Sequence, residues 1–383
     1  MIVAIPKEIT PGERRVAAIP ATVKELVKKG LTVHVQAGAG AGAFISDEEY
    51  QAAGASIINN VEELYRNADL ILKVDSPRLN PDIGKHEADF FKEGSAYISF
   101  FQTTMEIEAV RKFVENKITG FSMNLLPRTT LAQKMDALSS QSNIAGYKAV
   151  LIGAVHLGKY MPLLMTAAGT IPPAKVLILG AGVAGLQAIA TAKRLGAQVE
   201  AFDVRPEVKE QVESLGARFV EVPANEEEVV VEGGYAKETS ESYLKRQRAL
   251  IKEHIAKSDL VITTALIPGK PAPILIPADM VEGMSPGSVI IDLAAENGGN
   301  CELTEPGKIT TKHKVTIDGR LNLPSTMPIH ASQLYAKNIV SLVLHICPEG
   351  EINLNMDDEI IAGAMFTHDG DIVDERTRQA LNN

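Results

Sequence analysis

A glycine-rich turn between an apolar run and a helical pattern most constrains the fold of this chain. Residues 176–179 are typical of a buried parallel strand, and Gly180, Gly182 and Gly185 follow in the spacing G-x-G-x-x-G. In this motif the first glycine permits a tight turn, the second lets the backbone approach a pyrophosphate, and the third lets helix and strand pack closely. The phosphates then lie at a helix N-terminus, where the helix dipole is positive. The sequence therefore predicts a dinucleotide-binding turn.

A second strand and an acidic residue follow at the spacing of a dinucleotide fold. Residues 198–202 predict a strand that ends at Asp203, 18 residues after Gly185. A carboxylate there is placed to accept hydrogen bonds from an adenosine ribose and would repel a 2′-phosphate, which favours NAD(H) over NADP(H). Arg205 leaves the second choice open, because an arginine can accommodate that phosphate. The alternative is a glycine turn that only packs a helix, but the ordered succession of strand, turn, helix, strand and acid favours cofactor binding. The residues expected to contact the cofactor here are Gly180, Gly182, Val183, Ala184, Gly185, Asp203, Val204 and Arg205.

The composition limits the partners of the chain. Its 383 residues are enough for two domains, and a net charge of −10 without a basic cluster argues against nucleic acid as a partner. The two cysteines, Cys301 and Cys347, lack the spacing of a metal or redox site, and their scarcity is typical of a reducing compartment. None of the eight histidines pairs with another at metal-ligand spacing, so no metal is expected. No apolar run reaches the roughly 18 to 20 residues of a membrane helix, and the N-terminus lacks the features of a signal peptide. Any membrane role is therefore expected to come through partner subunits.

Alternating strand and helix patterns predict two α/β domains. We expect the fold class to be α/β, with two Rossmann-like doubly wound domains, mainly parallel sheets and long connecting helices. The first domain is predicted for residues 1–137 and 328–383, and the second for residues 138–327. Strands are predicted at 2–5, 32–36, 70–74, 96–101, 118–122, 175–179, 198–202, 218–221, 260–264, 288–293 and 314–317, with short strands in the tail at 353–373. Helices are predicted at 20–29, 61–66, 104–115, 186–193 and 330–346, and long helical structure from 131 to about 165.

An acidic, glycine-bearing segment at about 223–242 interrupts the second domain. Long loops inside compact domains are usually lids or binding loops, or else are disordered. Gly233 and Gly234 offer a hinge, and Tyr235 offers an amphipathic side chain to cover a ligand. A solvated acidic excursion is the alternative.

A polar cluster follows Pro127 at the predicted domain junction. Arg128, Gln133, Asp136, Ser139 and Asn143 recur at spacings near three or four, which predicts that most of them share one helical face. A polar face at a domain crevice is where a nicotinamide ring would find its partners. Helix capping followed by a solvated helix face explains the same residues equally well.

Two further strand ends contribute candidate pocket residues. Ligands of doubly wound sheets bind beyond the carboxyl ends of the strands. Ala265 and Leu266 follow the strand predicted at 260–264, and Glu296 follows the strand predicted at 288–293. Each is expected to line the pocket.

Several blocks of the chain resemble one known family. Residues 136–147, 165–176, 182–196, 234–238 and 263–273 are similar to the NAD(H)-binding component, domain I, of proton-translocating NAD(P) transhydrogenase, a family that also contains alanine dehydrogenase. The resemblance runs from Pro6 to about Asn338. It implies a homodimer of two-domain protomers with NAD(H) in the cleft, NADP(H) on a partner domain and a transmembrane partner subunit. It also implies a cytoplasmic location, peripheral on the inner side of a bacterial membrane.

The resemblance also implies roles for individual residues. Asp136 and Ser139 would fix the nicotinamide ring or its carboxamide, Arg128 would orient it, and Gln133 would reach toward the second nucleotide. These four residues are the expected catalytic set. Gly234 and Tyr235 would belong to a mobile loop that closes over the site, and Ala265 and Leu266 would lie beside the nicotinamide half of NAD(H).

Alanine dehydrogenase is the main alternative function. Its chemistry transfers protons as well as a hydride and needs a positioned acid or base, whereas transfer between two nicotinamides needs positioning and exclusion of water. Members with that activity carry a catalytic histidine where residues 99–104 of this chain have none, and an aspartate in place of Glu296. Arg15 and Lys73 resemble their substrate-binding residues and are interpreted here as structural salt-bridging groups. A module that senses NAD(H) without catalysis is a third possibility, which the polar cluster at Arg128–Ser139 disfavours.

Overall fold

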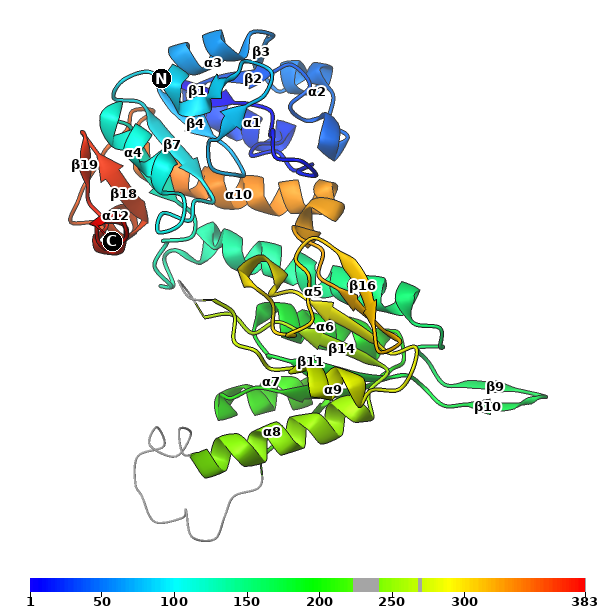
Figure 1. The fold of residues 1–383 in the computed structure, drawn as a ribbon. Helices are drawn as coiled ribbons and strands as arrows, with labels where there is room; N and C mark the ends of the chain where they lie inside the picture. Colours follow the sequence, from blue (N-terminus) through cyan, green and yellow to red (C-terminus); the bar gives the residue numbers. More distant parts are fainter. Residues whose placement is uncertain (223–240, 268–270, 383) are drawn as a thin grey trace. The chain divides into compact units, whose positions relative to one another are not determined.

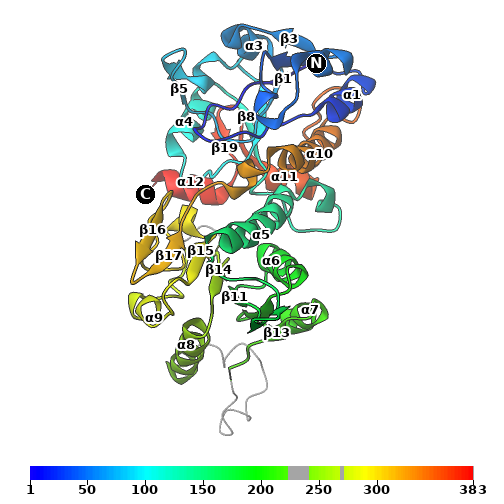
Figure 2. The ribbon, with the colours of Figure 1, turned by 90° about the vertical axis from the view of Figure 1, so that its right-hand side faces the viewer.

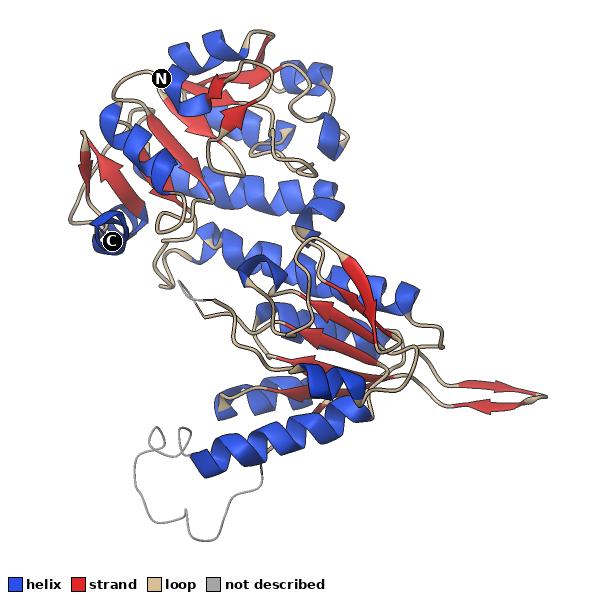
Figure 3. Ribbon diagram, in the orientation of Figure 1, coloured by secondary structure: helices blue, strands red, loops and turns tan. Residues whose placement is uncertain are grey.

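The computed structural model describes residues 1–222, 241–267 and 271–382. The chain divides into two compact units, which are described one at a time. Unit 1 consists of Met1–Gln141 and Pro324–Asn383, and unit 2 of Ser142–Leu323. Each unit has its own sheet and helices (Figures 1 and 3). The predicted fold class, two Rossmann-like α/β units with mainly parallel sheets, is confirmed.

The sheet of unit 1 has eight strands in the order β19-β18-β8-β7-β4-β1-β2-β3. Six neighbouring strands are parallel, and the C-terminal segment adds two antiparallel strands at one edge. The strands are β1 (Ile2–Ile5), β2 (Thr32–Gln36), β3 (Ser56–Ile58), β4 (Leu70–Leu72), β7 (Ala96–Ser99), β8 (Thr119–Ser122), β18 (Met365–His368) and β19 (Asp371–Ile372). A separate two-stranded ribbon pairs β5 (Leu79–Asn80) with β6 (Lys85–His86).

Helices cover both faces of this sheet, which explains the continuous apolar runs of its strands. In β1, Val3 and Ile5 pack into one buried cluster and Ala4 into another. The first cluster includes residues of α1 and α10, and the second includes residues of α3 and α4. The helices of unit 1 are α1 (Pro20–Lys28), α2 (Asp47–Ala52), α3 (Val61–Asn67), α4 (Ile107–Glu115), α10 (Pro328–Ile346), α11 (Glu359–Ala364) and α12 (Glu375–Asn382).

The sheet of unit 2 has the order β13-β12-β11-β14-β15-β17-β16. Counted along the six parallel strands, this is the order 3-2-1-4-5-6 of dinucleotide-binding folds, with β16 added antiparallel at one edge. The order reverses between β11 and β14, so the ligand-binding crevice is expected beyond the carboxyl ends of these two strands. The strands are β11 (Lys175–Leu179), β12 (Gln198–Phe202), β13 (Arg218–Phe219), β14 (Leu260–Thr263), β15 (Val289–Asp292), β16 (Ile309–Lys312) and β17 (Val315–Asp318).

The sheet of unit 2 is also covered on both faces (Figure 2). Ile178 of β11 packs with residues of α5, α6 and α7, whereas its neighbours Leu177 and Leu179 pack with residues of α8 and α9. The helices are α5 (Ala137–His156), α6 (Val183–Arg194), α7 (Lys209–Ser214), α8 (Glu241–Ala256) and α9 (Ala278–Glu282). Helix α5 contains the boundary between the units.

The predicted helical stretch to about residue 165 is wrong at both ends. The helix begins at Ala137 and ends at His156, before Gly158 and Pro162. Beyond it lies an antiparallel hairpin of β9 (Leu164–Thr166) and β10 (Gly169–Ile171), which projects from unit 2 (Figure 1). Its apolar side chains face outward, so they gave no signal of a packed strand.

The described residues contain no helix long and apolar enough to cross a membrane. Within the same ranges, no three or more His, Cys, Asp or Glu residues come together as a metal site. Both cysteines are buried and free, and burial raises the pKa of Cys301 to about 11 and that of Cys347 to about 12.

Candidate functional site

The glycine turn of unit 2 has the geometry that only glycine permits. Gly180 has a φ of +104°, and a Cβ there would lie 2.4 Å from the hydroxyl of Thr264. A Cβ on Gly185 would lie 1.9 Å from the carbonyl oxygen of Gly180, so α6 packs directly on the turn. A Cβ on Gly182 would meet no described atom within 4 Å, which leaves room beside its backbone for a ligand. These three positions fit the roles assigned to the motif.

The N-terminus of α6 opens at this turn and suits a pyrophosphate. Gly182 is the N-cap residue and supplies no side-chain cap for the first N–H groups of the helix. Val183 is exposed and Ala184 is partly exposed, so the backbone of the first turn is accessible to a ligand. Unpaired N–H groups and the positive end of the helix dipole bind phosphate at such termini. The residues present therefore fit the phosphates of a dinucleotide.

Asp203 fastens the glycine turn as well as facing the predicted ribose position. One carboxylate oxygen accepts a hydrogen bond from the backbone N–H of Ala181 at 2.7 Å, and the other accepts one from the N–H of Arg205 at 2.9 Å. The Arg205 guanidinium bonds both oxygens, each at 3.0 Å. Burial would raise the pKa of Asp203, but the hydrogen bonds from Arg205 and Ala181 outweigh it and hold that pKa below its usual value. Asp203 is therefore an anion fixed to the turn, and Arg205 is paired with it.

The end of β14 lies beside the glycine turn because β14 pairs with β11. The hydroxyl of Thr264 donates to the carbonyl of Gly180 at 3.0 Å. Ala265 and Leu266 come next, and the Leu266 side chain is 53% exposed. Within unit 2, the carboxyl edge of one sheet thus brings together the glycine turn, Asp203 and the Ala265–Leu266 pair.

Glu296 lies in the connection after β15 and is exposed. Its carboxylate accepts a hydrogen bond from the backbone N–H of Asn322 at 2.6 Å. The expectation that Glu296 lines the pocket stays a prediction.

In unit 1, the polar cluster forms the start of α5 rather than one helical face. Asp136 is the capping residue: its carboxylate accepts from the N–H of Ser139 at 2.9 Å and from the Ser139 hydroxyl at 2.6 Å. Gln133 lies in a 3-10 turn before the helix, and Arg128 lies further upstream. The predicted shared helical face is therefore wrong, because capping by Asp136 starts the helix only at residue 137.

The members of this cluster differ in their surroundings. Arg128 and Gln133 are exposed, whereas Asp136 and Ser139 are partly buried and bonded to each other. Asn143 falls in unit 2, where its amide donates to Gln187 at 3.0 Å. Gly234 and Tyr235 lie outside the described residues.

Lys73 belongs to a buried ionic cluster in unit 1 that sequence reasoning found only in part. Lys73 follows β4, is fully buried and lies 2.7 and 2.9 Å from the two carboxylate oxygens of Glu87. A Glu8 oxygen lies 3.7 Å from the same ammonium nitrogen. The Tyr65 hydroxyl donates to Glu87 at 2.5 Å, and Glu8 accepts from the N–H of Val74 at 2.6 Å.

Arg15 forms the second half of this ionic cluster. Its guanidinium bonds both oxygens of Glu13, at 2.9 and 2.6 Å, and donates to the side-chain oxygen of Gln141 at 3.0 Å. The interpretation of Arg15 and Lys73 as salt-bridging residues is confirmed. Their partners Glu8, Glu13 and Glu87 come from separate segments, and no sequence spacing links Glu87 to Lys73.

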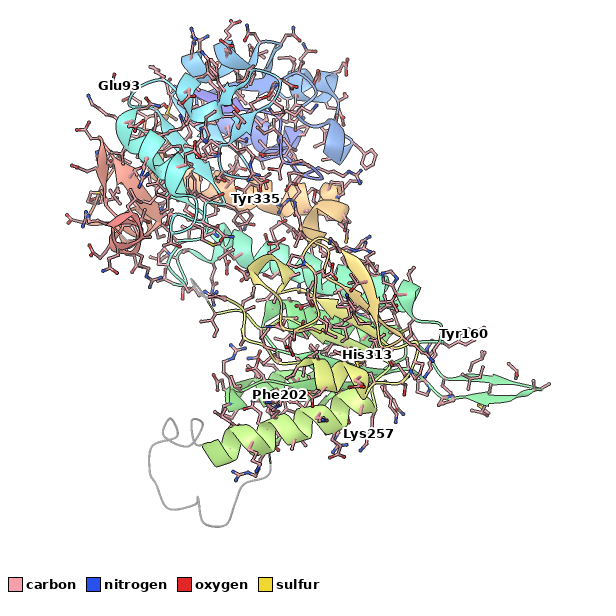
Figure 4. All side chains as sticks on the ribbon, viewed as in Figure 1. Glu93, Tyr160, Phe202, Lys257, His313 and Tyr335 are labelled. Atoms are coloured by element: carbon pink, nitrogen blue, oxygen red, sulfur yellow. The ribbon has the colours of Figure 1, made fainter. Side chains whose placement is uncertain are left out.

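The ionic cluster holds three carboxylates and two cations. Burial raises the pKa of Glu8 to about 8, against the lowering effect of Lys73 and the Val74 N–H. Tyr335, whose hydroxyl donates to the carbonyl of Lys73 at 2.7 Å, lies in the interior of the same unit (Figure 4). Glu8 is therefore the carboxyl group that keeps a proton near neutral pH.

Comparison with known proteins places the chain in a family. Residues 4–145 match the N-terminal domain model of alanine dehydrogenase/PNT, and residues 149–375 match the C-terminal domain model. The chain is 49% identical over 376 residues to the first part of the NAD(P) transhydrogenase alpha subunit of Rhodospirillum rubrum, which covers 97% of this chain and 98% of that protein. It is 31% identical to an alanine dehydrogenase of Staphylococcus saprophyticus, with 100% and 97% of the two chains covered.

Solved structures agree with this placement. A transhydrogenase from Sinorhizobium meliloti matches with a TM-score of 0.86 and 45% identity, covering 97% of this chain and all of the other. An L-alanine dehydrogenase matches with a TM-score of 0.83 and 28% identity, covering 100% and 99%. The chain therefore belongs to the alanine dehydrogenase/PNT family and is more similar to these transhydrogenase members than to these alanine dehydrogenases.

Proposed function

We propose that the chain is the NAD(H)-binding subunit of a proton-translocating NAD(P) transhydrogenase. It would pass a hydride between NADH bound to this chain and NADP⁺ bound to a partner domain. The observation that carries the proposal is the dinucleotide turn of unit 2 in a chain 49% identical, over nearly its full length, to a transhydrogenase alpha subunit. The partner domain and the transmembrane subunit are separate from the described units.

The residues of this chain act by holding and orienting the cofactor. The α6 N-terminus would bind the pyrophosphate, Asp203 the adenosine ribose, and Leu266 would pack beside the nicotinamide half. Arg128, Gln133, Asp136 and Ser139 would surround the ring. Bound NADH supplies the hydride. Because no proton moves at the reacting carbons, these side chains need only fix the ring and exclude water.

Alanine dehydrogenase chemistry would need two groups that the described residues do not offer. The segment that follows β7, from Phe100 to Thr104, contains no histidine to act as acid or base. Lys73 and Arg15 would have to bind a substrate carboxylate, yet Glu87 and Glu13 already neutralise them at 2.6–2.9 Å. We therefore expect no ammonia-dependent oxidation of NADH with pyruvate.

The deciding experiment is hydride transfer assayed with an NADP(H)-binding partner domain. The chain should bind NADH alone and should reduce an NAD analogue only when the partner and NADPH are added. Gln133→Asn should slow transfer far more than it weakens NADH binding, because Gln133 is proposed to act on the second nucleotide. Gln51→Asn, on the exposed surface of α2, is the matched control and should change neither quantity. Alanine deamination at a typical enzymatic rate, about 1 to 10³ per second, would contradict the proposal.

We infer that the β9–β10 hairpin contributes to a homodimer. A two-stranded hairpin is marginally stable alone in water, and this one exposes Leu163 by 54%, Met165 by 73% and Ile171 by 43%. Tyr160, near its base, is 55% exposed (Figure 4). A second copy of the chain would cover these side chains. Attachment to the cytoplasmic face of a bacterial membrane would then come through the transmembrane partner subunit.

A further inference from the structure

Asn300 fastens the connection after β14 to the connection after β15. Its side chain is fully buried. The carboxamide oxygen accepts from the N–H of Ala265 at 3.0 Å, and the amide nitrogen donates to the carbonyls of Ala265 at 2.9 Å and Pro273 at 2.8 Å. One side chain thus fixes both polar groups of Ala265 and a second point eight residues along the chain.

The backbone of the same residue strengthens this link. The carbonyl of Asn300 accepts hydrogen bonds from the N–H groups of Leu275 at 2.8 Å and Ile276 at 3.0 Å. Gly299, with a φ of +91°, makes the turn before Asn300, and a Cβ there would lie 2.7 Å from a carboxylate oxygen of Asp292. The turn therefore needs glycine, and Asn300 is held in one place by its own chain.

Asp292 anchors this arrangement to the sheet. It is buried at the end of β15 and accepts from the hydroxyls of Thr263 at 2.9 Å and Thr304 at 2.6 Å, and from the N–H of Cys301 at 3.0 Å. Thr263 is the last residue of β14. The two strand ends and the turn that carries Asn300 therefore form one hydrogen-bonded layer.

The clamped backbone carries exposed apolar side chains at the predicted crevice. Leu266 is 53% exposed and Ile267 is 46% exposed, directly after Ala265. On the other side of Ala265, Thr264 is bonded to the carbonyl of Gly180. The distance from the glycine turn to Leu266 is therefore set by fixed peptide groups, although the Leu266 side chain itself has no cover in unit 2.

We propose that Asn300 is a positioning residue that acts through Ala265 to hold Leu266 against the nicotinamide half of bound NAD(H). The inference rests on the proposed function. Asparagine suits the task because one carboxamide both accepts from an N–H and donates to two carbonyls. Aspartate would lose both donors, and serine would keep at most one.

The test compares two ligands that differ only in the nicotinamide. NADH and ADP-ribose share the pyrophosphate and the adenosine ribose, so both report on the glycine turn and Asp203. Asn300→Asp and Asn300→Ser should each weaken NADH binding about tenfold or more, which corresponds to about 1.4 kcal/mol. ADP-ribose binding should change less than about twofold, because a contact worth under about 0.4 kcal/mol is then affected. Equal losses for both ligands would overturn the inference and assign Asn300 a purely structural role.

A matched control disturbs the same buried layer without touching Ala265. Thr304→Val removes the hydroxyl that donates to Asp292 and keeps the shape of the side chain. It should lower the melting temperature and leave the ratio of the two affinities unchanged. The serine variant keeps the test valid if the aspartate variant fails to fold.

A double-mutant cycle tests the route through Leu266. Leu266→Ala alone should weaken NADH and spare ADP-ribose, and Asn300→Ser should then add little in the Leu266→Ala background. Additive losses would refute the route. Wild-type protein that binds neither ligand would instead refute the proposed function itself, so the two failures are distinguishable.

Discussion

The protonated state of Glu8 predicts an unusual pH dependence of stability. Its carboxyl group is buried beside Lys73 and, with Glu13 and Glu87, makes three carboxylates for the two buried cations Lys73 and Arg15. Burial raises the pKa of Glu8 from its usual 4.5 to about 8; Lys73 and the Val74 N–H oppose this, and the charges of Asp75 and Glu13 reinforce it. The folded protein therefore holds a proton that the unfolded chain releases.

The sign follows from that difference in bound protons. Because the folded state binds more protons between the unfolded pKa of 4.5 and the folded pKa of about 8, this group's contribution to stability falls as pH rises through that window. The slope is about 1.4 kcal/mol per pH unit, so the loss between about pH 5 and about pH 7 is roughly 2 to 3 kcal/mol. Most other paired carboxylates, such as Asp203, have lowered pKa values and act in the opposite direction.

Glu8→Gln isolates this term. Glutamine mimics the protonated carboxyl group, and its side-chain oxygen can still accept the hydrogen bond from Val74. Urea unfolding of both proteins, followed by the fluorescence of the buried tyrosines, gives the difference in unfolding free energy at each pH. The variant should gain relative to wild type as pH rises toward 8 and level off above it. Glu63→Gln, exposed on α3, is the control and should follow wild type. Parallel curves for wild type and Glu8→Gln would show that Glu8 is already ionised in the folded protein.

Three further substitutions test other features. Asp203→Ala should weaken NADH binding by roughly 1 to 3 kcal/mol, the scale for an unpaired buried group, in a fluorescence titration; unchanged affinity would remove Asp203 from the ribose site. Gly185→Ala places a Cβ 1.9 Å from the Gly180 carbonyl, so it should lower the melting temperature and abolish NADH binding, and retained binding would contradict the packing argument. Met165→Asp should convert the proposed dimer to monomer in light scattering, whereas an intact dimer would place the interface away from the hairpin.

The elements predicted well are those with local signals. The strand at 175–179, the glycine turn and the strand at 198–202 are encoded by apolar runs and by glycines that the turn requires, and the structure has β11 and β12 at those bounds. Where two local signals compete, the stronger one decides. At the start of α5, capping by Asp136 prevails over the periodicity that begins at Leu131. The ligand contacts of the site residues stay predictions.

Contacts between distant segments were beyond the reach of sequence patterns. Asp203 bonds the N–H of Ala181, 22 residues earlier, which no spacing rule for the ribose acid contains. Lys73 finds Glu8 and Glu87 only because three segments meet in the sheet of unit 1. Asn300 gave no signal at all, since a polar residue in a glycine-rich connection normally indicates a solvated turn.

The strand order of unit 1 has a consequence for the order of events during synthesis. β18 and β19, together with α10, belong to the segment that starts at Pro324, and β18 completes the sheet beside β8. Unit 2 is continuous in sequence, so all of it has been made before that segment appears. At about 5–20 residues per second, the earlier half of unit 1 waits several seconds on the ribosome with the edge of β8 unpaired. The nascent N-terminal half is therefore the stage at which we expect chaperones to bind this protein.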